Sequence, residues 1–258
     1  MIKVHYFTYA GHADLLSWTL EAGLKLLERS NLKYGVDISF VVIDDSNKPC
    51  DEITVEKWKT WGCEYRTSTF RRHGNLNGQE CIMGILAEFQ KSLRRKKDVI
   101  VKMDSDTLLL NTDWLEEFIS DKEALVTASD DRGCMYGMCY AMKPDIVSAL
   151  MEMFTRCPVS DRAQEDIYMG HRAKILAKSM AGDKGFMPLS IWLSTPDTPG
   201  PNGPHGRLIV YSWNQGLNIA HLYDQFSVIN VCNGMLRGET KMQEVKSLID
   251  IFVSRRLK

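Results

Sequence analysis

Two aspartates one residue apart follow a short apolar stretch near the middle of the chain. Residues 98–106 read DVIVKMDSD, so Asp104 and Asp106 stand where a buried strand would end. Side chains two positions apart on an extended segment point the same way, so both carboxylates can reach one point. Hard oxygen ligands beside an open loop suit Mg²⁺ or Mn²⁺, which often bridge to phosphates. The pattern favours a divalent ion holding a nucleotide diphosphate; the alternative is a polar turn with two solvated acids.

Polar residues also follow two earlier apolar stretches. The stretch IKVHYFTY predicts a first strand that ends in Thr8 and Tyr9, and DISFVVI predicts a second strand that runs into Asp44 and Asp45. In largely parallel α/β sheets, ligands bind outside the carboxyl ends of the strands. Three polar clusters at one edge of one sheet therefore predict a ligand site there.

Hydrophobic periodicity predicts the strands and helices that hold these clusters in place. The pattern alternates between that of strands and that of helices through the first half of the chain. The predicted strands are residues 2–9, 37–43, 62–67, 98–103, 125–129 and 207–213. The predicted helices are residues 15–30, 79–93, 115–119, 145–154 and 165–179, and the tail 239–255 also has helical periodicity. This βαβ rhythm indicates an α/β fold with a mostly parallel sheet flanked by helices.

Two segments of the second half have unusual compositions. Residues 133–142 (GCMYGMCYAM) combine glycine, methionine and aromatic residues, which fits either a backbone that approaches a ligand or a core strand. Residues 194–206 are dense in proline and glycine and predict a long irregular loop, either a closing lid or a fixed surface loop. No repeat or linker interrupts the chain, so we expect a single domain over 1–258, with halves 1–110 and 111–258.

Composition excludes several classes of protein. The 258 residues carry 32 basic and 33 acidic side chains, which argues against binding nucleic acid by bulk charge. Seven cysteines form no CxxC pair or zinc spacing, which is typical of a reducing compartment. No run approaches the ~18 apolar residues of a membrane span, and the N-terminus is too polar for a signal peptide. We therefore expect a cytoplasmic protein without a transmembrane segment.

Taken together, these motifs resemble the GT-A family of nucleotide-sugar glycosyltransferases, and the inverting, family-2-like members most closely. The resemblance covers roughly residues 2–175 and rests on four features: the first strand's end at Thr8, VVIDDSN after the second strand, DSD after a third apolar strand, and a Glu-Asp pair at a helix start. It implies a Rossmann-like, single-domain GT-A fold. The first turn, AGHAD, departs from the family pattern, which leaves donor sugar and acceptor open.

The resemblance also implies roles for particular residues. The nucleotide-binding residues would be Thr8, Tyr9, Asp44, Asp45, Asn77, Asp104 and Ser105. Asp104, Asp106 and His221 would hold Mn²⁺ or Mg²⁺, although a lone histidine is more often a half-buried structural residue. Asp166 would be the catalytic base with Glu165 beside it, and the alternative for Asp166 is a first-turn acid that stabilises its own helix.

The implied activity is metal-dependent transfer of a sugar from a nucleotide-diphosphate sugar, with UDP as the default carrier, to an acceptor hydroxyl. A base opposite the leaving group favours inversion, and retention is the alternative. The acceptor is open among glycan, lipid-linked, protein and modified nucleic-acid hydroxyls, the last if the scattered basic residues form a polyanion-facing patch. Two other classes are weighed: a catalytically inactive sugar-nucleotide-binding module, and a haloacid-dehalogenase-type phosphatase, whose expected threonine is here Leu108.

Overall fold

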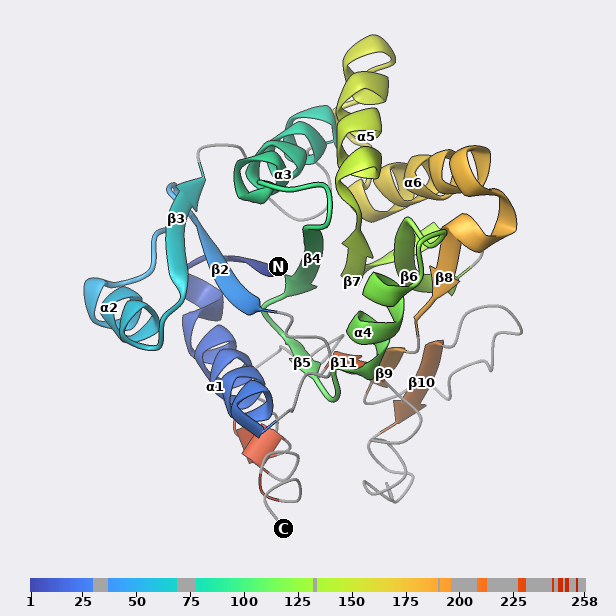
Figure 1. Cartoon of the computed structure of the whole chain (residues 1–258). Helices are drawn as coiled ribbons and strands as arrows, with labels where there is room; N and C mark the ends of the chain where they lie inside the picture. The colour runs from blue at the N-terminus through green and yellow to red at the C-terminus, as the bar shows by residue number, and fades with distance from the viewer. Residues whose placement is uncertain are drawn as a thin grey trace.

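The computed structural model describes residues 1–29, 37–68, 78–131, 134–189, 191–195, 208–212 and 227–230, with single positions between 243 and 254. Strands and helices alternate through the first half of the chain as predicted, with one helix, α2, that the sequence analysis did not predict (Figure 1). The strands are β1 (Ile2–Thr8), β2 (Ile38–Asp45), β3 (Glu64–Ser68), β4 (Val99–Asp104), β5 (Thr107–Leu109), β6 (Val126–Asp131), β7 (Cys134–Met142), β8 (Phe186–Pro188), β9 (Ile191–Thr195), β10 (Leu208–Ser212) and β11 (Val228–Asn230). The helices are α1 (Ala13–Arg29), α2 (Glu52–Thr60), α3 (Gly78–Ser92), α4 (Asp113–Ser120), α5 (Pro144–Arg156) and α6 (Glu165–Ala181), with 3₁₀ turns at Ala10–His12 and Gly182–Gly185.

Within the described part of the chain, seven strands form a central sheet in the order β3-β2-β1-β4-β7-β6-β8. Every neighbouring pair is parallel except the two that involve β7, which runs antiparallel to β4 and to β6. A second, smaller sheet among the described residues has the strand order β10-β9-β11-β5. Its strand β5 follows directly after the aspartate turn. The fold is thus α/β with a mostly parallel central sheet, as predicted.

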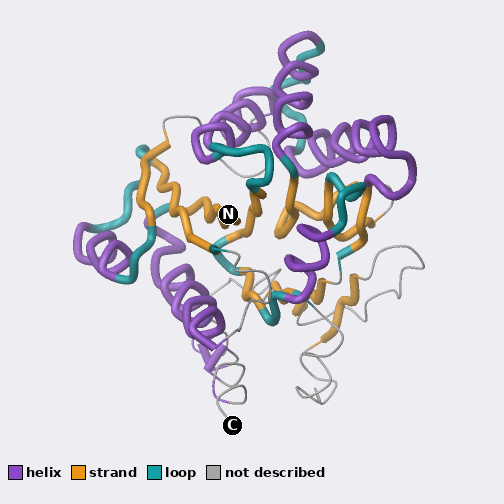
Figure 2. The backbone as a smooth tube through the Cα atoms, viewed as in Figure 1, coloured by secondary structure: helices purple, strands orange, loops and turns teal. Residues whose placement is uncertain are grey.

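Helices cover both faces of the central sheet (Figure 2). One face packs against α3, α5 and α6 through an apolar cluster that includes Phe89, Phe154 and Met169. The other face packs against α1, α2 and α4 through a cluster that includes Leu16, Trp58 and Phe118. Parallel strands that are buried on both faces have continuous apolar sequences. The stretches VVI and VIV therefore predicted the strands that the structure shows as β2 and β4.

Two predicted boundaries need correction. Strand β2 extends two residues beyond the predicted end, so Asp44 and Asp45 belong to the strand. Strand β9 extends to Thr195, so the first two residues of the predicted loop 194–206 are extended and paired with β10. In both cases the added residues pair with a neighbouring parallel strand, so their backbone groups join its ladder of hydrogen bonds. The rest of that loop lies outside the described residues.

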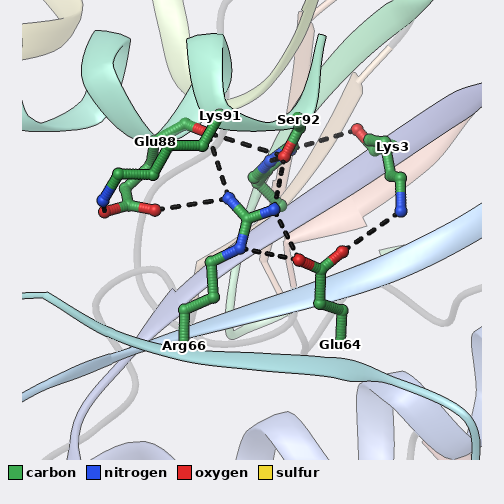
Figure 3. Close-up of polar contacts among 7 residues, drawn as sticks. Lys3, Glu64, Arg66, Glu88, Lys91 and Ser92 are labelled. Atoms are coloured by element: carbon green, nitrogen blue, oxygen red, sulfur yellow. Dashed lines mark hydrogen bonds and ion pairs between the residues drawn. The ribbon is translucent and has the colours of Figure 1, made fainter. Parts of the chain in front are cut away.

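A partly buried polar network fastens α3 to the sheet at β1 and β3 (Figure 3). Arg66 on β3 donates to Glu64 Oε1 from both Nε (2.8 Å) and NH2 (2.6 Å), and its NH1 lies 3.4 Å from Glu88 Oε2. Its NH2 also donates to Ser92 Oγ (3.0 Å), which lies 2.7 Å from Nε2 of His5. Since Glu88 is 4 % exposed and His5 is fully buried, the network fixes how α3 sits on strands β1 and β3.

Candidate functional site

The strand ends that carry the predicted polar residues meet at one edge of the sheet. Thr8 on β1 lies opposite Asp44 on β2, and Phe7 lies opposite Asp104 on β4. Asp45 in turn lies opposite Ser68 on β3. The parallel register therefore aligns three chain segments that are far apart in sequence, at the edge where such sheets bind ligands.

Asp44 is fully buried and its carboxylate is used by the protein itself. Its Oδ2 accepts hydrogen bonds from the backbone N–H of Cys50 (2.8 Å) and from the hydroxyl of Tyr65 (2.8 Å). Burial, followed by these contacts with Asp44, raises the pKa of both the Cys50 thiol and the Tyr65 phenol. Asp44 thus braces the loop after β2, and Tyr65, which sequence reasoning did not identify, holds it in place.

Asp45 is the second-strand acid with an oxygen left for a ligand. It alternates with Asp44 along the strand, so its side chain points to the opposite face. In the described residues, its hydrogen bonds come from the N–H (2.9 Å) and the amide Nδ2 (2.9 Å) of Asn47, and both end on Oδ1. Asp45 is 6 % exposed, so a ligand that reached Oδ2 would be bound in a largely desolvated place.

The exit of β1 offers a hydroxyl and an aromatic face. Thr8 is 1 % exposed, and its Oγ1 finds no hydrogen-bond partner among the described residues. Buried hydroxyls are nearly always paired in native proteins, so this one fits an external donor or acceptor. Tyr9 is 36 % exposed and its ring lies 4.5 Å from the imidazole of His12, tilted by 33°. These features fit the predicted nucleoside pocket.

His12 ties the first turn to the aspartate turn. Its Nδ1 lies 2.7 Å from Ser105 Oγ, and the Ser105 carbonyl accepts a hydrogen bond from Thr19 Oγ1 at 2.9 Å. Ser105 is buried, and its hydroxyl contacts the protein rather than an open pocket. The structure therefore places Ser105 as a brace of the turn. His12 stands in the AGHAD turn that departs from the family pattern, and only the fold shows its contact.

The two aspartates of the DSD turn are differently placed. Asp104 ends β4, with 37 % of its side chain exposed, and Asp106 is half-buried just before β5. No cluster of three or more His, Cys, Asp or Glu side chains suited to a metal occurs among the residues that the structure describes. His221, the predicted third ligand, and Asn77 lie outside the described residues. The Asp104–Asp106 pair suits a Mg²⁺-like ion that takes its other ligands from water and phosphate.

A buried lysine lies beside this pair. Lys102 is 4 % exposed, and its Nζ is 2.6 Å from Asp104 Oδ1 and 4.0 Å from Glu165 Oε2. It also donates to the carbonyl of Gly137 on β7 and lies 5.7 Å from the ring centre of Tyr140. Sequence reasoning missed Lys102, although a lysine two residues before Asp104 in an otherwise apolar strand was a readable signal.

Glu165 and Asp166 open α6 but occupy different surroundings. Glu165 is buried, and its Oε1 accepts a hydrogen bond from the Tyr140 hydroxyl at 2.9 Å. Burial raises the pKa of Glu165, and Lys102 and Tyr140 oppose that rise. Asp166 is half-exposed and lies against Gly137, where a Cβ would stand 2.7 Å from the Asp166 Cβ. Of the pair, Asp166 is the residue with the more exposed side chain.

Of the predicted segment 133–142, residues Cys134–Met142 form strand β7, and Gly137 in it packs closely against α6. The absent side chain at Gly137 makes room for Asp166, and the carbonyl of Gly137 contacts Lys102. The two contacts bring the start of α6 close to the end of β4. Asp104 and Asp166 thus flank one short stretch of β7, although 62 positions separate them in the sequence.

The fold is shared with known enzymes. Two structures of LgtC, an active-site mutant and the galactosyltransferase in complex with donor and acceptor sugar analogues, align with TM-scores of 0.52 and 0.51 at 11 % and 13 % identity. They cover 95 % and 98 % of this chain and 95 % of each LgtC chain. The chain has a GT-A-like glycosyltransferase fold. The bifunctional glycosyltransferase WbbM aligns with 99 % of this chain and 51 % of its own (TM-score 0.50, 11 % identity).

The α/β GT-A-like fold agrees with the prediction, and the likeness to these enzymes lies in the structure rather than in matching sequences. Neither a protein-family model nor a curated protein sequence matches the chain. At 10–13 % identity the likeness concerns the fold. Membership of family 2 stays a prediction. No helix in the described part of the chain is long and apolar enough to cross a membrane.

Proposed function

We propose that this protein is a glycosyltransferase that moves a sugar from a nucleotide-diphosphate sugar, with UDP as the carrier, to an acceptor hydroxyl. The observation that carries the proposal is the alignment of Thr8, Asp45 and Asp104 at the carboxyl edge of a GT-A-like sheet. LgtC, which aligns over nearly its whole length, has been crystallised with donor and acceptor sugar analogues, and the proposal assigns the same two kinds of ligand here.

The nucleoside would lie over the ends of β1 and β2. The Thr8 hydroxyl, which has no partner among the described residues, and the Asp45 Oδ2 supply polar contacts, and the exposed ring of Tyr9 supplies a face on which a base or ribose can pack. Asp44 does not contact the nucleotide in this proposal, because Cys50 and Tyr65 use its carboxylate. It keeps the loop that carries Asp45 in place.

The diphosphate would lie over the DSD turn. Asp104 and Asp106 would hold Mn²⁺ or Mg²⁺, with His221 proposed as a further ligand. Such an ion, when bound, neutralises charge that develops on the departing diphosphate. Lys102 pairs with Oδ1 of Asp104 and the side chain is 37 % exposed, so Oδ2 is the oxygen proposed to reach the ion.

Asp166 is proposed as the base that accepts the proton of the acceptor hydroxyl. It is half-exposed at the start of α6, whereas Glu165 is buried against Tyr140 and would position Asp166 through the helix. A base on the acceptor side and a leaving group over the DSD turn favour a single displacement with inversion. Retention is the alternative, and the configuration of the product decides between them.

Calorimetry with a panel of nucleotide sugars tests the proposal, with and without Mn²⁺. We expect one UDP-sugar to bind in a metal-dependent way and the Asp106→Ala variant to lose at least tenfold in affinity, because one of two carboxylate ligands is gone. Asp183→Ala, which removes an exposed carboxylate paired with Lys178, is the matched control and should bind as wild type does. No binding by the wild type across the panel would refute the proposed function.

A further inference from the structure

Lys102 is a buried cation in direct contact with a proposed metal ligand. It occupies the middle of an apolar strand, between Val101 and Met103, and only 4 % of its surface is exposed. Its side chain points to the same face as Asp104, two residues later, and its Nζ lies 2.6 Å from Asp104 Oδ1. An ion pair at this distance places a positive charge next to the carboxylates of the DSD turn that are proposed to bind the metal ion.

The surroundings of Lys102 confine this charge. The ammonium donates to the Gly137 carbonyl on β7 and lies 4.0 Å from Glu165 Oε2 on α6. The ring of Tyr140 lies beneath it, with the ring centre 5.7 Å from Nζ. Moving a buried ammonium away from its paired oxygens costs several kcal/mol, so Lys102 stays at Asp104. A divalent ion must therefore bind next to a cation that cannot leave.

Few protein ligands offset this repulsion. In the described residues, the DSD turn offers two carboxylates, and one of them already shares its charge with Lys102. Opposite charge must come from elsewhere if the ion is to bind tightly. The diphosphate of a donor carries that charge, and Mg²⁺-like ions readily take phosphate oxygens as ligands.

We propose that Lys102 is a resident cation that weakens binding of the bare divalent ion, so that the ion binds tightly only when the diphosphate supplies further ligands. Lys102 acts through Asp104 and is a positioning residue rather than a catalytic one. Coupling between two ligands is reciprocal, so the diphosphate tightens Mn²⁺ by the same factor by which Mn²⁺ tightens the diphosphate. The inference rests on the proposed function, since it requires a metal and a diphosphate at the DSD turn.

Titration of Mn²⁺ followed by electron paramagnetic resonance, with and without UDP, measures this coupling without any turnover. We expect UDP to tighten Mn²⁺ binding to the wild type by more than tenfold. In Lys102→Met, an uncharged side chain of similar length, Mn²⁺ alone should bind at least tenfold more tightly than it binds the wild type in the absence of UDP. The neutral Lys102→Gln, which can still donate to Gly137, should behave alike and serves if the methionine variant does not fold.

Two controls separate charge from disruption of the network. Glu165→Gln breaks the same buried cluster but keeps the cation, so it should not tighten Mn²⁺ binding and should keep the coupling. Lys178→Met removes an exposed lysine that pairs with Asp183 and should leave both constants unchanged. If Glu165→Gln tightened Mn²⁺ as Lys102→Met does, general loosening of the site would be the cause and the inference would be overturned.

The wild-type result distinguishes this inference from the function on which it rests. If the wild type binds Mn²⁺ neither alone nor with UDP, the proposed metal-dependent function is wrong, and the role proposed for Lys102 is wrong with it. Wild type that couples Mn²⁺ and UDP supports the function. Should the Lys102 variants then bind Mn²⁺ alone no more tightly than the wild type does, the function stands and the role assigned to Lys102 is wrong.

Discussion

Replacing Gly170 by alanine tests how closely α6 must approach β7 to place Glu165 and Asp166. A Cβ at Gly170 would stand 2.7 Å from the Met135 Cβ and 2.8 Å from the Met135 backbone nitrogen. Backbone atoms of a central strand cannot rotate aside, so the helix itself must move. The substitution therefore perturbs stability and site geometry together.

The expected magnitude follows from two opposing terms. Alanine inside a helix gains about 0.5–1 kcal/mol over glycine because less backbone entropy is lost on folding. Overpacking a tight contact costs about 1–3 kcal/mol. The net change for Gly170→Ala is then a loss of about 1 kcal/mol in the free energy of unfolding, within a range of roughly 0–2.5 kcal/mol.

Gly23→Ala in α1 is the matched control. A Cβ there meets only the tip of the Phe40 ring at 3.3 Å, and that ring can shift by a few tenths of an ångström. The helix-propensity gain should dominate, so this variant should be neutral or up to about 0.5–1 kcal/mol more stable. The two variants should thus differ by roughly 2 kcal/mol, which is about 4–8 °C in Tm for a chain of this size.

Urea and thermal unfolding measure the difference, and donor binding by calorimetry reports on the site. Gly170→Ala should unfold first. If Gly170→Ala were as stable as Gly23→Ala, the close contact between α6 and β7 would not constrain the helix, and the argument that glycine packing positions Asp166 would be wrong.

Two further predictions concern a buried histidine and the proposed base. Burial, helped by Arg66, lowers the pKa of His5 to about 3 from its usual 6.5, so the unfolded chain gains a proton first as pH falls. The contribution of His5 to stability should be fully present above pH 6.5. The free energy of unfolding should then fall by about 2 kcal/mol between pH 6.5 and 5, at 1.36 kcal/mol per pH unit. The free energy of unfolding of His5→Gln should depend less on pH over this range. Asp166→Asn should lower donor turnover by about 10²–10⁴-fold while the Kd for the donor changes less than threefold; unchanged turnover would remove Asp166 as the base.

Much of the fold could be read from local patterns. The apolar runs of β1, β2 and β4 and the periodicity of α1, α3, α5 and α6 identified these elements within a few residues. Strand direction also followed, because a βαβ alternation favours parallel pairing. The polar residues at the strand ends could be placed at one edge of the sheet for the same reason.

Contacts between distant segments could not be read this way. The sequence pattern treats Asp44 and Asp45 alike, yet Tyr65 and Cys50 use the first and leave the second with an oxygen for a ligand. Glu165 and Asp166 are likewise adjacent, and only the packing of α6 on β7 buries one and exposes the other. Burial depends on which surfaces meet, and periodicity does not specify the partner.

The sequence by itself determined the α/β class, the mostly parallel sheet and the DSD turn at a strand end, because backbone geometry and apolar periodicity are local properties. Tertiary structure alone decided the order of the strands, the antiparallel insertion of β7 and the meeting of Lys102, Asp104, Gly137 and Glu165. Electrostatic and packing energies depend on distances of a few ångströms between residues up to 63 positions apart, and only the folded chain sets those distances.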